Sequence, residues 1–117
     1  MHELSIAQSV VELVSEQLSE GQRVSLVRLR IGALSSVHQD ALNFSYELIT
    51  EGTPLEKSQL EIQMVPVKVY CTQCQSEVEL PGIQKFACPV CQTPSGDIRQ
   101  GRELDLESFQ LAAESPV

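Results

Sequence analysis

The chain contains four cysteines, and all of them lie in two Cys-x-x-Cys pairs. Cys71 and Cys74 form the first pair, and Cys88 and Cys91 form the second pair after a spacer of thirteen residues. A Cys-x-x-Cys turn can direct both of its sulfurs at one point, so two such turns can enclose one tetrahedral ion. The spacing is close to the usual four-cysteine zinc pattern. The sequence therefore predicts a zinc-ribbon module in which a metal replaces a hydrophobic core.

Other uses of four cysteines fit this sequence less well. Two disulfides would suit an exported chain, but the N-terminus has no basic region followed by an apolar one. A redox Cys-x-x-Cys needs only one pair and leaves the second unexplained. A tetrahedral all-sulfur site also suits iron, so a rubredoxin-like iron site stays open at this point.

The composition restricts the remaining function classes. The formal net charge is −8, whereas a general nucleic-acid binder needs an excess of Lys and Arg. No apolar run approaches the roughly 18 residues of a membrane helix. No Ser–His–Asp set, phosphate loop or paired-carboxylate pocket is recognisable, and a site closed by four cysteines leaves no position for a substrate. We therefore expect a cytoplasmic protein that binds neither nucleic acid nor membrane and is not an enzyme.

Residues outside the cysteine pairs follow helical and strand periods. Apolar residues at helical spacing predict a helix over residues 3–20 and a second helix from a Ser36–Gln39 capping box to about residue 51. Alternation predicts strands over residues 24–31, 60–64 and 104–107. The expected buried faces are Leu4, Ala7, Val10, Val11, Leu13, Val14 and Leu18 on the first helix, and Ala41, Leu42, Tyr46, Leu48 and Ile49 on the second.

The order of these elements predicts an α+β fold. Two helices cover a three-stranded sheet, and the four-cysteine zinc-ribbon module is inserted before the last strand. The predicted domains are an α/β body, residues 1–67 and 103–117, and a zinc-binding module, residues 68–102. An inserted module of this kind could be exchanged between two copies of the chain, which would produce a homodimer.

The first three residues, Met1, His2 and Glu3, form a second candidate metal site. The α-amine of Met1, the first backbone amides and the His2 imidazole lie within a few bonds of one another, so they can chelate a metal in small rings. Ni(II) and Cu(II) favour such nitrogen sites, and the first amides of a helix have no intrahelical acceptor. Two plainer interpretations stay open: His2 as a solvated terminal residue, and Glu3 as a carboxylate that favours the helix dipole.

Several motifs together resemble the hydrogenase nickel-incorporation family HypA/HybF over nearly the whole chain. They are Met1-His2-Glu3-Leu4-Ser5-Ile6-Ala7, the two Cys-x-x-Cys pairs, Arg30-Ile31-Gly32-Ala33-Leu34 and Gly101-Arg102-Glu103-Leu104. The resemblance implies a metallochaperone with a structural zinc ion. Such a protein delivers Ni(II) to the large subunit of NiFe-hydrogenase, in concert with a nickel-insertion GTPase of the HypB type, and some members also serve urease.

The resemblance also implies which residues bind nickel. The ligands would be His2 and the backbone nitrogens of His2 and Glu3, with the Met1 amine as a further donor and Asp40 associated with nickel in some members. Asp40 has a plainer role, because a carboxylate in a first helical turn favours the helix dipole. Glu3 is linked in the family to contact with the GTPase. His38, the only other histidine, is expected to be a solvated neighbour of the helix cap.

The sequence departs from the family pattern at a few positions. Gln75 and Gln92 follow the cysteine pairs where many zinc turns place Gly, and the zinc module contains no histidine. The alternative function is a zinc-ribbon module for protein interaction or nucleic-acid association. The acidic charge and an aromatic content of 4% disfavour that alternative, because single-stranded nucleic acid is bound by basic grooves with aromatic stacking platforms.

Overall fold

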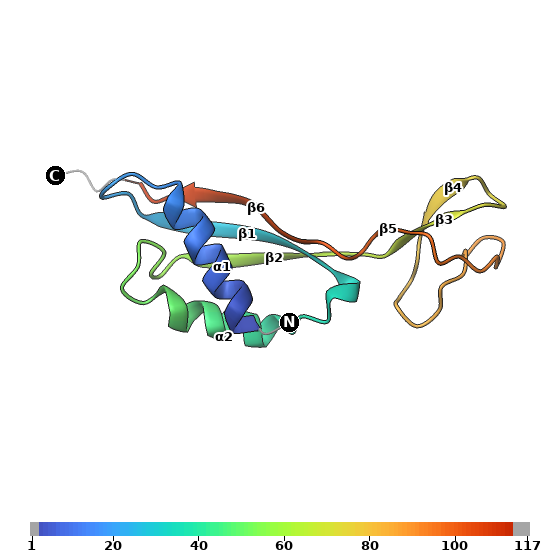
Figure 1. Ribbon diagram of the computed structural model, residues 1–117, viewed down its shortest axis with the longest axis horizontal. Coiled ribbons are helices and arrows are strands. Elements are labelled where there is room, and N and C mark those ends of the chain that lie inside the picture. The colour runs from blue at the N-terminus through green and yellow to red at the C-terminus, as the bar shows by residue number, and fades with distance from the viewer. Residues whose placement is uncertain (1–2, 114–117) are drawn as a thin grey trace. The chain divides into compact units, whose positions relative to one another are not determined.

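The computed structural model describes residues 3–113 (Figure 1). It contains two α-helices, a short 3-10 helix (η1) and six strands. In chain order they are α1 (Glu3–Glu16), β1 (Val24–Gly32), η1 (Ala33–Ser35), α2 (Gln39–Thr50), β2 (Gln59–Val65), β3 (Lys68–Cys71), β4 (Ser76–Glu79), β5 (Ile98–Gln100) and β6 (Leu104–Leu111). The predicted α+β fold with two helices, a three-stranded sheet and an inserted cysteine module is confirmed.

The strands form two separate three-stranded sheets. The first sheet has the order β2-β1-β6, and its members are the three strands that alternation predicted. The second sheet has the order β4-β3-β5, with β3 antiparallel to both neighbours, and it belongs to the cysteine module. These three strands are only three or four residues long, which is too short for alternation to identify.

Packing divides the chain into two compact units. Unit 1 comprises Met1–Leu29, Val37–Ile62 and Leu106–Val117, and unit 2 comprises Arg30–Ser36 and Gln63–Asp105. The chain therefore passes between the units four times. This division does not test which part binds which metal, so the division into a nickel-binding body and a zinc-binding module stays a prediction.

The core of unit 1 is aliphatic. Helix α1 buries Ile6, Ala7, Val10 and Val14, α2 buries Leu42, Tyr46 and Thr50, and β1 adds Val24, Val27 and Leu29. The two helices pack against each other. Burial of each large aliphatic side chain stabilises the fold by about 1.5–3 kcal/mol, so this apolar face orders both helices.

Some predicted boundaries and buried positions are wrong. Helix α1 ends at Glu16 rather than near residue 20, because the N–H of Gln17 already bonds the carbonyl of Val14 in a three-residue turn. Four predicted core positions, Leu4, Leu13, Ala41 and Leu48, are exposed.

The predicted Ser36–Gln39 capping box is also wrong. His38 is the N-cap of α2 and makes no side-chain capping bond, while Ser36 closes η1 in the left-handed region at φ 60°.

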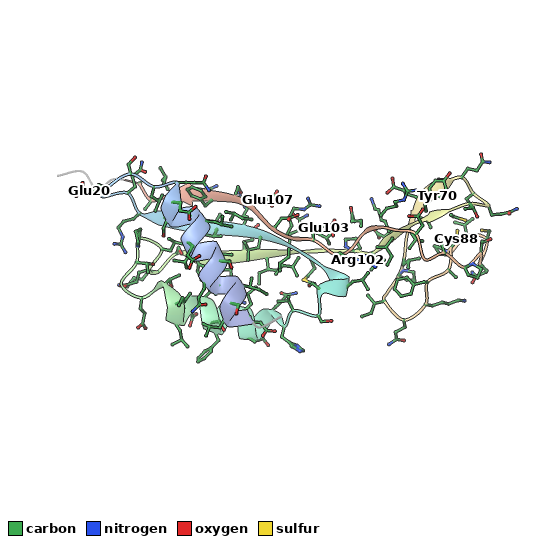
Figure 2. The ribbon with its side chains drawn as sticks, in the orientation of Figure 1. Glu20, Tyr70, Cys88, Arg102, Glu103 and Glu107 are labelled. Atoms are coloured by element: carbon green, nitrogen blue, oxygen red, sulfur yellow. The ribbon has the colours of Figure 1, made fainter. Side chains whose placement is uncertain are left out.

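Two glycines permit a close backbone approach in unit 2. The N–H of Gly32 donates to the Glu103 carbonyl at 2.7 Å, and the N–H of Leu34 donates to the Gly101 carbonyl at 2.9 Å. A Cβ on Gly32 would lie 2.0 Å from the Gly101 oxygen. Figure 2 marks Arg102 and Glu103 on the second of these segments. The segments around residues 30–34 and 101–104, noted as separate motifs in the sequence, thus meet in one joint.

Candidate metal centre

The four cysteine sulfurs of unit 2 lie within 4.8 Å of one another. The Sγ–Sγ distances are 3.5 Å between Cys71 and Cys91, 3.6 Å between Cys74 and Cys91, and 3.8 Å between Cys74 and Cys88. Four sulfurs around a tetrahedral Zn²⁺ with about 2.3 Å bonds stand about 3.8 Å apart. The sulfurs are therefore spaced for one metal ion, and they are too far apart for a disulfide, which needs about 2.05 Å.

A β-hairpin places the first cysteine pair. Cys71 ends β3 and is paired with Ser76 at the start of β4, so Cys74 lies in the connecting turn. The N–H of Cys74 donates to the Cys71 sulfur at 3.4 Å, which turns both sulfurs to the same side. Gln75 returns the chain to β4 in the left-handed conformation, with φ 53°. The hairpin therefore needs, directly after the cysteines, a conformation that glycine adopts most readily.

The second pair lies in a turn of the same kind. The N–H of Gln92 donates to the Cys88 carbonyl at 2.8 Å, and the N–H of Cys88 donates to the Thr93 carbonyl at 2.9 Å. Gln92 again takes the left-handed conformation, with φ 65°. The side chain of Gln92 accepts a hydrogen bond from the Lys85 ammonium at 3.0 Å. Both non-glycine residues noted in the sequence are thus accommodated without loss of the turns.

Hydrogen bonds join the second turn to β3. The Ser95 hydroxyl donates to the Tyr70 carbonyl at 2.6 Å, and the Tyr70 N–H donates to the Asp97 carbonyl at 2.9 Å. Arg99 forms two 2.9 Å bonds with the Asp97 carboxylate and lies over the Tyr70 ring, 4.9 Å from its centroid. Figure 2 marks Tyr70 and Cys88 within this unit. Residues just outside the cysteines therefore fix the distance between the two turns.

The metal-free thiols differ in acidity. Hydrogen bonding with Cys91, and then with Cys71 and Cys88, raises the pKa of Cys74 to about 12. The hydroxyl and the backbone N–H of Thr93 lower the pKa of Cys91 to about 6, and the hydroxyl oxygen lies 3.2 Å from its sulfur. A metal that binds all four sulfurs as thiolates must displace the proton of Cys74. Metal binding should therefore release protons and strengthen as pH rises.

Two of the cysteines are shielded from water. Cys71 and Cys88 are buried, whereas Cys74 and Cys91 are exposed. Four sulfurs complete a tetrahedral shell and leave no position for a substrate, which is the arrangement of structural rather than catalytic zinc. The donor set and its spacing thus fit a structural zinc ion.

The N-terminal candidate site is described only from Glu3 onward. Met1 and His2 lie outside the described residues. The Glu3 carboxylate accepts a hydrogen bond from the backbone N–H of His38 at 3.2 Å. Its own backbone N–H and that of His38 lower the pKa of Glu3. This bond brings the start of α1 to the start of α2, whose first turn contains Asp40.

This contact replaces the capping box that the sequence suggested. In a capping box, a Glu or Gln at the third position of a helix accepts a hydrogen bond from the backbone N–H of that helix's own N-cap residue. Here Glu3 of α1 accepts the hydrogen bond from the N–H of His38, the N-cap residue of α2. Asp40 lies two residues after His38, in the first turn of α2, and its part in nickel binding stays a prediction. His38 and Asp40 are exposed. Sequence reasoning missed the contact because its partners are 35 residues apart.

Among residues 3–113, no helix combines the length and apolar character needed to cross a membrane.

Comparison with known proteins gives consistent matches along the chain. Residues 1–111 match the family model HypA, described as hydrogenase/urease nickel incorporation, metallochaperone. The hydrogenase maturation factor HypA of Chloroflexus aggregans is 48% identical over 112 residues, which cover 94% of this chain and 98% of that protein. The corresponding factor of a Roseiflexus species is 42% identical over 118 residues, covering 99% and 96%.

Solved structures show the same arrangement of elements. The solution structure of the Ni metallochaperone HypA from Helicobacter pylori has a TM-score of 0.66 and 25% identity, and the match covers 97% of this chain and 100% of that one. A second solution structure of a HypA protein, 24% identical with a TM-score of 0.69, shares the fold. These matches do not favour a zinc-ribbon module associated with nucleic acid.

Proposed function

Since the chain belongs to the HypA family of nickel metallochaperones for hydrogenase and urease, we propose that it carries Ni(II) on its first residues while Cys71, Cys74, Cys88 and Cys91 hold a structural zinc ion. The observation that carries this proposal is the family match from residue 1 to residue 111, which includes both candidate sites. The two sites would have opposite tasks. One releases its ion, and the other keeps it.

The proposed nickel ligands are the His2 imidazole and the backbone nitrogens of His2 and Glu3, with the Met1 amine and Asp40 as further donors. Helix α1 begins at Glu3, so the first amides have no acceptor one turn earlier in the helix. Few ligands at a chain end suit micromolar affinity, about 8 kcal/mol, from which a partner can remove the ion. Binding through deprotonated amides would weaken steeply as pH falls.

The proposed zinc ion orders unit 2. That unit has a small apolar cluster of Val67, Val69 and Leu80 with partly buried neighbours, and a core of this size supplies little stability by itself. Closed four-thiolate sites contribute folding free energy directly. We expect the zinc ion to remain bound through a cycle of nickel uptake and release.

The proposed partners are a nickel-insertion GTPase of the HypB type and the large subunit of NiFe-hydrogenase, with urease maturation as a further destination. We expect the transfer of nickel to these partners to take place in the cytoplasm, without binding of nucleic acid or membrane and without catalysis by this chain. A homodimer formed by exchange of residues 68–102 is part of the same proposal. Its support is the discontinuity of unit 2 in the chain.

The test is a nickel titration by calorimetry on untagged protein that retains Met1. His2→Ala is compared with wild type, and His38→Ala is the matched control because it removes the other histidine. We expect wild type and His38→Ala to bind about one nickel at micromolar strength and His2→Ala to bind none, with equal zinc content in all three. Equal nickel binding by His2→Ala would contradict the ligand assignment.

A further inference from the structure

Helix α2 (Gln39–Thr50) exposes an apolar stripe as well as burying one. Leu42, Tyr46 and Thr50 face the core. Ala41, Phe44 and Leu48 follow the same helical spacing on the outside, where Phe44 is 64% exposed and Leu48 is 54% exposed. Phe44 is the only exposed aromatic residue between residues 3 and 113. Single exposed apolar residues are normal, but a stripe centred on an aromatic residue is typical of a docking surface.

An acidic stripe runs beside the apolar one. At about 100° per residue, Asp40, Glu47 and Glu51 fall on one side of Phe44 and Leu48. The chain contains no Lys or Arg between Arg30 and Lys57. The outer face of α2 therefore combines an apolar stripe with carboxylates that no basic residue of the helix neutralises.

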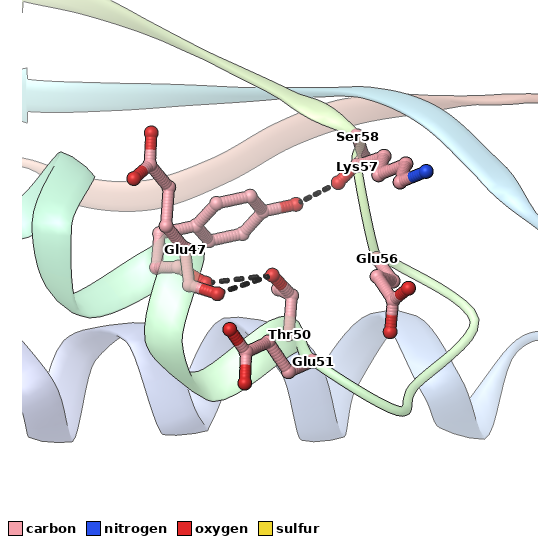
Figure 3. Close-up of a pocket in the computed structure, with 7 residues that line it drawn as sticks. Glu47, Thr50, Glu51, Glu56, Lys57 and Ser58 are labelled. Carbon is pink, nitrogen blue, oxygen red and sulfur yellow. Dashed lines mark hydrogen bonds between the residues drawn. The ribbon is translucent and has the colours of Figure 1, made fainter.

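The acidic edge continues into a groove between α2 and the start of β2. Two adjoining depressions of about 530 and 460 Å³ share Tyr46, Glu47 and Ser58 in their walls. Figure 3 shows the carboxylates of Glu47, Glu51 and Glu56 around the first of them. The hydrogen bond between the Tyr46 and Ser58 hydroxyls, 2.5 Å long, fixes the floor. Lys57 also lines this depression, so its wall has three carboxylates and one ammonium group, a local excess of negative charge beside the apolar stripe.

The net charge of the chain is concentrated in the unit that contains α2. Unit 1 has three Lys or Arg and eleven Asp or Glu, a formal charge of −8, whereas unit 2 has five of each and is neutral. The whole formal charge of −8 thus belongs to unit 1. A partner with a basic contact surface would be attracted to this unit before contact, which raises the association rate.

We propose that the outer face of α2, formed by Ala41, Phe44 and Leu48 with Glu47 and Glu51 at its edge, docks a partner protein that presents an apolar pocket bordered by Lys and Arg. Phe44 enters the pocket, and the carboxylates pair with the basic border. Aromatic anchors in desolvated pockets carry most of the affinity of such interfaces, while rim charges chiefly affect the association rate. The inference rests on the proposed function, because it assigns a surface to the maturation partners.

The test measures binding to two purified probes, the nickel-insertion GTPase and the hydrogenase large-subunit precursor of the same organism. The apolar variant is Phe44→Ser with Leu48→Ser. Its matched control is Leu13→Ser on α1, because Leu13 is 48% exposed and lies in the same unit. The charge variant is Glu47→Gln with Glu51→Gln, and its control is Glu12→Gln with Glu16→Gln. Zinc content, helicity and nickel titration are measured for every variant.

We expect the apolar variant to weaken binding to at least one probe by tenfold or more, with Leu13→Ser close to wild type. The charge variant should slow association several-fold and reduce its salt dependence, unlike its control. Nickel and zinc binding should be unchanged, so a failure here is distinct from a failure of the nickel proposal.

Three outcomes overturn the inference. The apolar variant can bind both probes as wild type does. Wild type can bind neither probe, which would also remove the partners from the proposed function while leaving the nickel titration to stand by itself. Wild type can instead self-associate in a way that Phe44→Ser abolishes, in which case this face covers a second copy of the chain.

Discussion

Replacement of Gly32 by Ala would test the backbone joint within unit 2. Gly32 has φ −71° and ψ 146°, which any residue adopts without strain. The added Cβ would nevertheless lie 2.0 Å from the Gly101 carbonyl oxygen and 2.6 Å from the Arg102 nitrogen. Because these are backbone atoms, no side chain can rotate away to relieve the overlap.

The expected size of the effect follows from the contacts at this joint. Separating the two segments lengthens the bonds from Gly32 to Glu103 and from Leu34 to Gly101, each of which contributes about 0.5–1.5 kcal/mol. An overpacked methyl costs about 1–3 kcal/mol more. The reduced freedom of the unfolded chain offsets about 0.4–1 kcal/mol. The net loss in the free energy of unfolding is therefore about 1–5.5 kcal/mol, and each kcal/mol lowers the Tm by about 4 °C in a domain of this size.

The assay should report on unit 2 rather than on the whole chain. Zinc release during urea unfolding, followed with a chromogenic chelator, reports on that unit, and far-ultraviolet circular dichroism reports on the helices. Gly82→Ala is the matched control, because Gly82 also lies in unit 2 and a Cβ there would have no neighbour within 4 Å. We expect Gly82→Ala to release zinc at the wild-type urea concentration or slightly above it.

The reasoning would be refuted if Gly32→Ala released zinc at the same urea concentration as Gly82→Ala. That result would mean that the two segments can separate without affecting the metal site. The joint would then have no part in stabilising unit 2.

Three further predictions concern the two candidate sites. Cys88→Ser should lose zinc and the hydrogen-exchange protection of β3 and β5, while α1 keeps its protection; retained zinc would contradict a site of four ligands. Gln75→Gly should raise the free energy of unfolding measured by zinc release in urea by about 0.5–1 kcal/mol and Gln75→Val should lower it, because φ 53° is costly for any side chain; equal values would show that the turn is not strained. Glu3→Gln should be less stable than wild type at neutral pH. The folded-state pKa of Glu3 is lowered from 4.5, so its contribution is present above the unfolded value and disappears as pH falls through the lowered one. A difference in unfolding free energy that persists in acid would contradict this.

The metal centre was predictable because its signal is local. Two residues between the cysteines of each pair fix the turn, and the spacer only has to return the chain to the ion. Gln75 and Gln92 stand where many zinc turns have Gly, and the structure places both residues in the left-handed region. The first sheet was predictable for a similar reason, since β1 (Val24–Gly32) has a buried face that alternates with half-exposed arginines.

Contacts between distant segments were not predictable. The hydrogen bond between Glu3 and His38 uses the backbone N–H of His38. Every residue except proline has such a donor, so the residue type at position 38 does not predict the bond. Gly32 and Gly101 were each identified as part of a motif, but nothing in a single sequence pairs them.

The sequence also does not determine which face of α2 is buried. The helix has two apolar stripes, one with Leu42 and Tyr46 and one with Phe44 and Leu48, and periodicity finds both. Which of the two is buried depends on the packing of α1 and β1. Periodicity alone predicts that Leu48 is buried, and in the structure Leu48 is 54% exposed.

The joint between residues 30–34 and 101–103 also has a consequence for synthesis on the ribosome. Its two halves are separated by about 70 residues, so at roughly 5–20 residues per second several seconds pass between their translation. All four cysteines are translated within this interval. The joint is therefore the last part of unit 2 that can form, because its second half follows all four cysteines in the chain.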